Sequence, residues 1–356
     1  MIFLTGGTGM LGAHLLVDLT KRGEQVKALR RKNSDLKHVR KIFSWYSYEA
    51  ERLFGQIEWV EGDILDRISL RAAMEGADTV IHAAAKLSFD PRDRETVLYE
   101  NVEGTANLVD LALELNIQRF CQVSSVAALG NQDFGIPVNE DLSWKNDDQR
   151  SAYSESKFQS EMEVWRGIEE GLNAVIVNPS VILGPGKWES GSPRFFHTMH
   201  NGMKFYTDGS TGFVDVRDVS LAIIGLLQSK KWESIKNQRY VISAENLTFR
   251  EVFDCIAVAL NQQKPTIRAN RILLQLGWRA SRLVSLLSGR EPTLTKETAR
   301  SAGTISAYDG SKIIRTIDFS YTPIEKTIQD IGRIFVDERE KVKLKNISPA
   351  CSVSLI

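Results

Sequence analysis

The chain has 356 residues, of which 42% are hydrophobic and 25% are charged, and its 45 basic and 45 acidic side chains cancel. These proportions are typical of a globular protein and exclude a fibrous or largely disordered chain. The balance of charge also excludes the global basic field that attracts nucleic acid or an anionic membrane. An anionic ligand therefore has to be held by a local group of residues.

The cysteines indicate a reducing compartment. Cys121, Cys255 and Cys351 lie far apart, without the spacing of metal ligands and without an even-numbered disulfide framework. No segment approaches the ~20 apolar residues of a membrane span, and no charged and apolar leader precedes the first predicted strand. We therefore expect a cytoplasmic protein with no metal site, no membrane span and no nucleic-acid partner.

The first predicted strand and helix are joined by a glycine-rich turn. A short apolar run at 2–4 predicts the strand, and the apolar positions Leu11, Leu15, Leu16 and Leu19 then recur at helical spacing. Gly6, Gly9 and Gly12 lie between the strand and the helix or at the start of the helix. In such a turn the first glycine permits a tight bend, the second lets the backbone approach a pyrophosphate, and the third allows close helix packing. The free N–H groups at the helix start attract the anion. This predicts a dinucleotide site.

The second predicted strand, 25–30, indicates which dinucleotide is used. It ends where the adenosine ribose of the cofactor is expected, and Arg30, Arg31 and Lys32 stand there in place of the acidic residue that would accept from the 2′-hydroxyl of NAD. Guanidinium groups bind phosphate in a two-pronged geometry, so the sequence favours NADP(H). NAD(H) stays open, because Asp35 could fold back to the ribose.

Alternating strands and helices predict an α/β fold, a doubly wound parallel sheet of the Rossmann type. The expected strands are 57–61, 79–83, 119–124 and 174–178, and the expected helices are 68–75, 105–116 and 156–170. Segment 35–54 is expected to form a helix that packs over the sheet, with a role facing adenine or a partner less favoured. We assign 1–183 to the dinucleotide domain, with 213–246 returning to it.

The remaining chain is expected to form a mostly helical substrate lobe, 184–212 and 247–335, followed by a loose tail over the uncharged residues 346–356. Capping boxes mark two helix starts in this part: Thr248 with Glu251, and Thr322 with Glu325.

Ser125, Tyr153 and Lys157 are the predicted catalytic residues. A tyrosine has a reference pKa of about 10 and is a poor acid at neutral pH, but a cation one helical turn away favours the phenolate. Lys157 stands four residues after Tyr153. Ser125 follows a predicted strand at the carboxyl edge of the sheet, where its hydroxyl can bond a substrate oxygen, and Ser124 is the competing candidate.

The chain resembles the extended short-chain dehydrogenase/reductase (epimerase/dehydratase) family. The motifs that carry the resemblance are Thr5-Gly-Gly-Thr-Gly-Met-Leu-Gly12, Ser125 and Tyr153-x-x-x-Lys157. Further matching segments are Gly62-Asp-Ile64, Ile81-His-Ala-Ala-Ala-Lys86, Asn101-Val-Glu-Gly-Thr105, Asn178-Pro-Ser-Val-Ile-Leu-Gly-Pro-Gly186 and Phe213-Val-Asp-Val-Arg-Asp218. The resemblance implies that the cofactor-binding residues are Gly6, Thr8, Gly9, Met10, Leu11, Gly12, Arg30, Arg31, Asp63, Ile64, Ala83, Ala84, Ala85, Lys86, Val123, Tyr153, Lys157, Pro179, Ser180 and Val181. It also implies that Asn101 positions a water molecule for proton resupply.

Within the family, the chain is most similar to dihydroflavonol-reductase-like and hydroxysteroid-dehydrogenase-like members. Ser124-Ser-Val126 lacks the Asp-Glu pair that sugar dehydratases place after the catalytic residue, so a dehydratase is disfavoured. The resemblance implies NADPH-dependent reduction of a ketone or aldehyde. A nucleotide-sugar epimerase with the same three residues and a non-catalytic, cofactor-sensing protein are the alternatives.

The substrate is expected to be a small molecule in a partly apolar pocket, with Phe89, Trp188, Phe195 and Phe196 as the candidate contacts. Family members often form dimers through the helices at 105–116 and 156–170, so a homodimer is one expected assembly and a monomer is the other.

Overall fold

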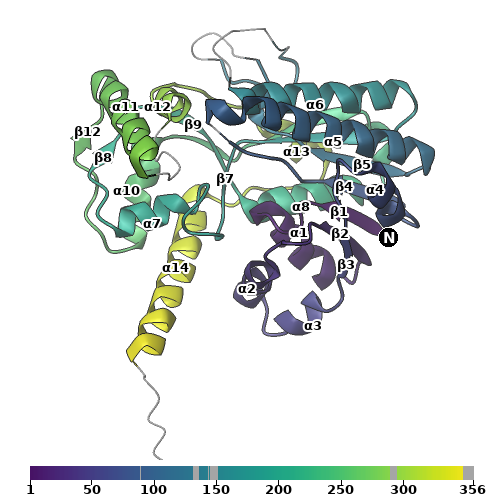
Figure 1. The fold of residues 1–356 in the computed structure, drawn as a ribbon, viewed down its shortest axis with the longest axis horizontal. Coiled ribbons are helices and arrows are strands. Elements are labelled where there is room, and N and C mark those ends of the chain that lie inside the picture. Colours follow the sequence, from purple (N-terminus) through teal and green to yellow (C-terminus); the bar gives the residue numbers. More distant parts are fainter. Residues whose placement is uncertain (89, 131–135, 143, 145–150, 289–294, 348–356) are drawn as a thin grey trace, which may run out of the picture.

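The computed structural model describes the chain except for residues 89, 131–135, 143, 145–150, 289–294 and 348–356. Within the described part, a seven-stranded sheet lies at the centre of the molecule (Figure 1). In spatial order its strands are β10 (Gln238–Ile242), β6 (Ala174–Pro179), β5 (Arg119–Val123), β4 (Thr79–His82), β1 (Ile2–Thr5), β2 (Val26–Arg30) and β3 (Glu58–Glu61).

All neighbouring strands of this sheet are parallel. Their carboxyl ends therefore share one edge, and the strand order reverses its direction between β1 and β4, which is where such sheets form a ligand crevice. The strands β1, β4 and β6 are buried along their whole length, as expected for a sheet that is covered on both faces. The predicted fold class is confirmed.

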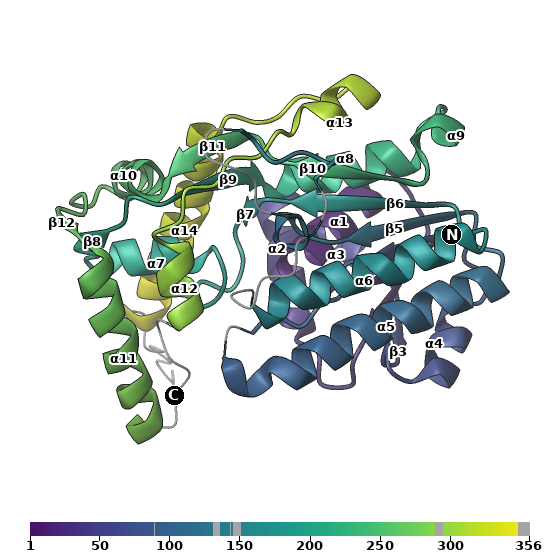
Figure 2. The same cartoon turned by 90° about the horizontal axis from the view of Figure 1, so that it is seen from above.

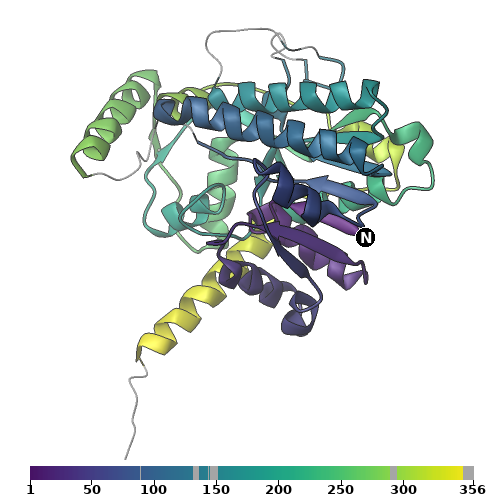
Figure 3. The ribbon, with the colours of Figure 1, turned by 45° about the vertical axis from the view of Figure 1, so that its right-hand side comes forward.

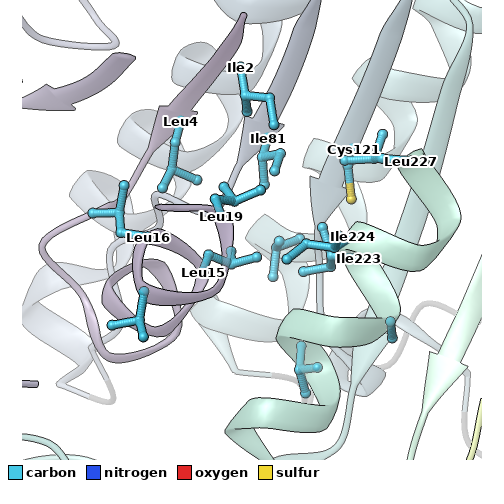
Figure 4. Packing of buried hydrophobic residues seen from close by; sticks show 14 of the residues in the cluster. Ile2, Leu4, Leu15, Leu16, Leu19, Ile81, Cys121, Ile223, Ile224 and Leu227 are labelled. Carbon is cyan, nitrogen blue, oxygen red and sulfur yellow. The ribbon is translucent and has the colours of Figure 1, made fainter. Parts of the chain in front are cut away.

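Helices cover both faces of the sheet. One face carries α1 (Met10–Lys21) and α8 (Val216–Leu227), and the other carries α4 (Arg67–Met74), α5 (Arg94–Glu114) and α6 (Ala152–Glu169). In Figure 4, Leu15 and Leu19 of α1 have the strand residues Ile2 and Ile81 on one side and Ile223 of α8 on the other. Burial of these apolar side chains fixes both helices against the sheet.

Segment 35–54 forms two helices, so the prediction of one helix is wrong. The helices are α2 (Leu36–Tyr46) and α3 (Ala50–Phe54), and the chain is extended at Ser47 between them. Phe43 and Phe54 are buried in the same core as α1, so the expected packing role is confirmed.

The helices next to the site start earlier than predicted. α5 begins at Arg94, eleven residues before the expected start. The sequence did not indicate these first turns, because they are mostly polar and show no clear apolar period. α6 begins at Ala152, where the Ser151 side chain accepts from the Ser154 N–H at 3.0 Å. As a consequence, Asn101 and Tyr153 both lie within helices.

The lobe follows directly on the carboxyl end of β6 (Figure 2). It contains a small sheet of β11 (Glu245–Thr248), β9 (Ser210–Asp215) and β7 (Val181–Leu183), a strand pair of β8 (Phe205–Tyr206) and β12 (Ile267–Arg268), and the helices α7 (Arg194–His200), α10 (Phe249–Ala259), α11 (Arg271–Ser288) and α12 (Lys296–Ser301). The chain returns from β9 through α8 and α9 (Trp232–Ile235) to β10 of the main sheet.

The C-terminal helix α14 (Ile324–Ile347) follows α13 (Ser311–Thr316) and extends away from the body (Figure 3). It covers the first two residues of the predicted loose tail, and the rest of that tail lies outside the described residues. The capping box at Thr248 is confirmed, with Glu251 as its partner. The box at Thr322 is wrong, because both its N–H and its hydroxyl donate to Asp218, at 2.7 and 2.9 Å.

Candidate functional site

Close packing requires glycine at two of the three glycine positions in the turn between β1 and α1. Gly6 has a φ of +75°, and a Cβ there would lie 2.5 Å from the Ala83 carbonyl carbon. A Cβ on Gly12 would lie 2.1 Å from the Gly6 oxygen. Gly9 is less crowded, since its Cβ would meet only that oxygen, at 3.3 Å. Its missing side chain leaves the start of α1 open, which fits a phosphate at the helix N-terminus.

The other residues predicted to bind the cofactor follow the same edge of the sheet. Thr8, Met10 and Leu11 belong to the turn and the first turn of α1; Asp63 and Ile64 follow β3; Ala83, Ala84, Ala85 and Lys86 follow β4; Val123 ends β5; and Pro179, Ser180 and Val181 lie where β6 passes into β7. The structure thus brings residues from five strand ends to one edge of the sheet, and their contact with a dinucleotide stays a prediction.

The basic end of β2 is flanked by carboxylates. Arg31 Nε lies 3.1 Å from the Asp63 carboxylate, and its Nη2 lies 3.2 Å from that of Glu100. Arg30 Nη2 lies 3.8 Å from Glu61, while Arg30 Nε is buried and has no hydrogen-bond partner among the described residues. That unpaired N–H is available to a ligand oxygen at the expected position of the adenosine ribose. The carboxylates of Asp63 and Glu100 oppose a phosphate beside Arg31, and the preference for NADP(H) stays a prediction.

Ser125, Tyr153 and Lys157 meet at the carboxyl end of β5. Ser125 follows that strand and caps the short helix η2 (Val126–Ala128), whose Ala127 N–H it accepts at 3.1 Å. The Tyr153 side chain is hydrogen-bonded to the Ser125 side chain. Lys157 lies one helical turn after Tyr153, and its Nζ donates to the Val123 carbonyl at 2.9 Å. The three residues named from the sequence are therefore neighbours in space.

Burial sets the electrostatics of this group. It raises the pKa of Tyr153, and the hydrogen bond with Ser125 lowers it. Burial lowers the pKa of Lys157 to about 8, and the nearby Glu161 carboxylate opposes that shift. The structure thus identifies Ser125 as a group that acts on the Tyr153 pKa, and the expected action of Lys157 on it stays a prediction.

Asn101 connects two elements of the site. Its Oδ1 accepts from the Lys86 N–H at 2.7 Å, and its Nδ2 donates to the Lys86 carbonyl at 3.0 Å and to the Ser156 hydroxyl at 2.9 Å. Both hydrogens of the amide are therefore used within the protein. Asn101 joins the loop after β4 to helix α6 immediately before Lys157.

The residues predicted to contact the substrate are mostly lobe core. Trp188 is 7% exposed, donates from its indole N–H to Glu338 and lies 4.9 Å from Phe335 between ring centroids, and Phe196 is fully buried. Phe195 is partly buried against Phe253. Their contact with a substrate stays a prediction, and Phe89 lies outside the described residues.

A family model supports the interpretation that this geometry suggests. Residues 2–243 match the model described as NAD dependent epimerase/dehydratase family. The match covers the glycine turn, the three residues at the end of β5 and the return to β10. The chain belongs to this family. The relationship to the extended short-chain dehydrogenase/reductases, inferred from the motifs, is confirmed.

Several known proteins are similar to this chain over most of their length. The chain is 28% identical to a putative dihydroflavonol 4-reductase of Synechocystis over 92% of both chains. It is 30% identical to sterol demethylase protein B of Methylococcus capsulatus, over 76% of this chain and 78% of that protein. The crystal structure of gox2253 has a TM-score of 0.76 at 26% identity and covers 95% of this chain and 98% of its own.

Glu161 is a residue of the site that the sequence analysis missed. It is fully buried on α6, one turn after Lys157, and accepts from Asn178 Nδ2 at 2.5 Å. The same Nδ2 donates to the Ser125 carbonyl at 3.0 Å. Arg239 of β10 lies 3.5 Å from the Glu161 carboxylate. The spacing of Tyr153, Lys157 and Glu161 by four residues was the available signal, because it predicts one helix face.

Glu161 and its partners extend the site to the loop before α6. Arg239 donates to the backbone carbonyls of Glu140 and Leu142, at 2.7 and 2.8 Å. The Glu140 carboxylate in turn accepts from the Val241 N–H at 2.8 Å. The competing candidate Ser124 is buried beside Glu161. Ser125, by contrast, is hydrogen-bonded to Tyr153, and its contact with a substrate stays a prediction.

Proposed function

We propose that this protein is an NADPH-dependent reductase of a ketone or aldehyde, with Ser125, Tyr153 and Lys157 as its catalytic residues. The observation that carries the proposal is the hydrogen bond between Tyr153 and Ser125 at the carboxyl end of β5, at the same edge of the sheet as the glycine turn. Both hydroxyl groups can face one substrate oxygen there.

Each side chain has a distinct part in this reaction. Nicotinamide, when bound, supplies the hydride. The Tyr153 hydroxyl donates its proton to the oxygen of the reduced carbonyl group, and the Ser125 hydroxyl holds and polarises that oxygen. The ammonium group of Lys157 favours the phenolate that remains on Tyr153. Asn101 acts by positioning, because its amide fixes the Lys86 loop against α6.

The glycine turn and the start of α1 would hold the pyrophosphate of the cofactor, and Arg30 would hold the 2′-phosphate of NADP(H) through its unpaired Nε. We therefore expect Arg30→Asp to weaken NADPH binding relative to NADH binding. Titration of both nucleotides by fluorescence measures this ratio, and an unchanged ratio would reject the preference for NADP.

The relatives support a reductase that acts on a small organic carbonyl compound, since one of them carries the name dihydroflavonol 4-reductase. An epimerase would use the same three residues, because transient oxidation and return of the hydride need the same acid and base. We place the protein in the cytoplasm, as its cysteine usage indicates, and propose contact between α5 and α6 of two copies as the assembly if it dimerises.

The test follows NADPH absorbance with aromatic ketones, steroid ketones, dihydroflavonols, aldehydes and nucleotide-sugars, with product analysis on the sugars. Tyr153→Phe should retain cofactor affinity and lose about 100-fold or more of the turnover, because the proton donor is gone. Interconversion of sugars without net loss of NADPH would indicate an epimerase. Nucleotide binding without any turnover would favour the cofactor-sensing alternative.

We also propose that Glu161 is a positioning residue for this reaction. Its carboxylate contacts Asn178, which holds the Ser125 carbonyl, and Arg239, which holds the loop at Glu140. It therefore links three elements that surround the reacting groups without itself reaching the crevice.

A further inference from the structure

The outer end of the lobe has a charge pattern that differs from the rest of the chain. Between Cys255 and Ser288 the sequence contains no aspartate or glutamate but five cations: Lys264, Arg268, Arg271, Arg279 and Arg282. The whole chain has 45 acidic residues in 356, about one in eight, and no net charge. Since this segment carries a charge of +5, the remainder carries −5. Lys264 and Arg268 pair with Asp254 and Asp208, which lie outside this segment, and the neutral total conceals the basic region that the other three cations form.

The same region exposes large apolar side chains. On α11 the exposed fractions are 71% for Ile272, 39% for Leu273 and 60% for Leu276, and on the β8–β12 pair they are 46% for Phe205 and 44% for Ile267. Phe205 and Ile267 are directly paired in the two strands. Figures 1 and 2 both show α11 leading away from this strand pair at the end of the molecule remote from β3.

The junction between the strand pair and the helix is built by specific hydrogen bonds. The Ala269 N–H donates to the Tyr206 carbonyl at 2.7 Å, and the Asn270 side chain accepts from the Leu273 N–H at 2.9 Å. These bonds fix the start of α11 to the β8–β12 pair. The exposed apolar side chains of the strands and of the helix thus belong to one supported structure.

Cationic and apolar side chains share the exposed face of α11. Ile272 and Leu276 are one turn apart, and Arg279 is exposed one further turn along, where its guanidinium lies 4.8 Å from the Trp278 ring centroid. A helix that combines an apolar stripe with arginine and tryptophan is suited to the boundary between lipid headgroups and acyl chains.

We propose that α11 and the β8–β12 pair, here called the lobe tip, dock this protein on an anionic lipid surface. The apolar side chains of the lobe tip would enter the headgroup boundary, and the exposed Arg279 would face lipid phosphates. Arg268 and Lys264 are each paired with an acidic residue, Asp208 and Asp254, so they contribute less to this attraction. The contact is peripheral. No helix among the described residues has the length and apolar character of a membrane span.

The charge pattern favours lipid over a protein partner. An acidic protein would satisfy the cations, but the exposed stripe of Ile272, Leu273 and Leu276 would also need a matching apolar groove. A lipid surface offers both chemistries at once and requires no matching shape. The proposal is independent of the reductase proposal, because it uses none of the residues at the end of β5.

The test is flotation of the full-length protein with vesicles of phosphatidylcholine alone and with 30% phosphatidylglycerol, at low and high salt. We expect binding to the anionic vesicles at low salt, and its loss at high salt, because salt screens exposed charges. Leu276→Asp and Arg279→Gln should each lower the bound fraction, and together they should lower the partition coefficient by about tenfold or more.

Matched controls come from the sheet domain. Ile68→Asp and Arg22→Gln make the same chemical changes at exposed positions far from the lobe tip and should leave flotation unchanged. Circular dichroism and thermal unfolding establish that each variant is folded. The proposal is overturned if anionic vesicles do not bind the protein, or if variants and controls behave alike. Dissociation of a dimer by Leu276→Asp, measured by light scattering without lipid, would instead assign the lobe tip to a second copy of this chain.

Discussion

The carboxyl edge of the sheet and the lobe tip differ in which side chains they bury and which they expose. At the sheet edge Lys157, Glu161 and Asn101 are buried, while at the lobe tip Ile272 and Leu276 are exposed. A buried charge is costly unless partners compensate it, and an exposed apolar stripe gains free energy only when something covers it. The first region is therefore the proposed site of the chemistry, and the second is the proposed docking surface.

The largest expected effect tests how tightly the sheet edge is packed. Gly12→Ala places a Cβ 2.1 Å from the Gly6 oxygen, so we expect a loss of about 3 kcal/mol or more in the free energy of unfolding, together with loss of nucleotide binding. Gly23→Ala is the control, because it has a φ of +75° but nothing within 4 Å, and should cost roughly 1–2 kcal/mol. Urea unfolding measures both, and equal losses would contradict the packing argument.

The next effect concerns the buried polar network. Glu161→Gln retains the shape of the side chain but removes the charge that faces Arg239, so we expect kcat to fall by about tenfold to 100-fold with little change in nucleotide affinity. Glu163→Gln is the matched control on the same helix, where Glu163 is partly exposed and pairs with Arg166. If both variants keep wild-type kcat, Glu161 has no positioning role.

The pH dependence of turnover separates electrostatic from purely structural action of Glu161. Burial lowers the pKa of Lys157 to about 8, and the Glu161 carboxylate raises it. A reductase that needs the Lys157 ammonium should lose kcat/KM as the pH rises through about 8. Removing the negative charge in Glu161→Gln lowers the pKa of Lys157 further, so this alkaline loss should move to lower pH. If the pH profile of kcat/KM does not move in Glu161→Gln, then Glu161 acts only through its structural contacts.

The smallest expected effect is at the lobe tip. Leu276→Ala should change the free energy of unfolding by less than about 0.5 kcal/mol, because the side chain is exposed and alanine is a good helix former. Leu16→Ala, the same change in the core shown in Figure 4, should cost about 2–5 kcal/mol. Thermal and urea unfolding compare the two. A large loss at Leu276 would mean that the protein itself covers this position.

Local patterns were sufficient for much of the fold. Apolar runs predicted six of the seven strands of the parallel sheet, and the glycine spacing predicted the β1–α1 turn, since both depend on neighbours along the chain. The seventh strand, β10, was expected only as part of the returning segment 213–246. Helix starts were less predictable. The first turns of α5 and the break between α2 and α3 have no clear apolar period. Contacts with other helices support them, since Arg94 of α5 pairs with Glu155 of α6 and Arg40 of α2 pairs with Glu51 of α3.

The candidate site shows the same division. Tyr153 and Lys157 could be paired from their spacing, because four residues always place two side chains on one helix face. Thr322 could not be interpreted from its spacing to Glu325, because Asp218, distant in sequence, takes both of its hydrogens. Trp188 is a large aromatic residue of the kind that lines pockets, and its contacts with Phe335 and Glu338 in the lobe core could not be predicted from neighbours along the chain.

By itself the sequence determined the sheet class, the nucleotide turn and the helix face that carries Tyr153 and Lys157, because each depends on residues within a few positions of one another. Only the tertiary structure decided that Glu161 meets Arg239, that carboxylates surround Arg31 and that the apolar face of α11 is exposed. Burial and charge pairing depend on which distant segments come together, and no local period encodes that choice.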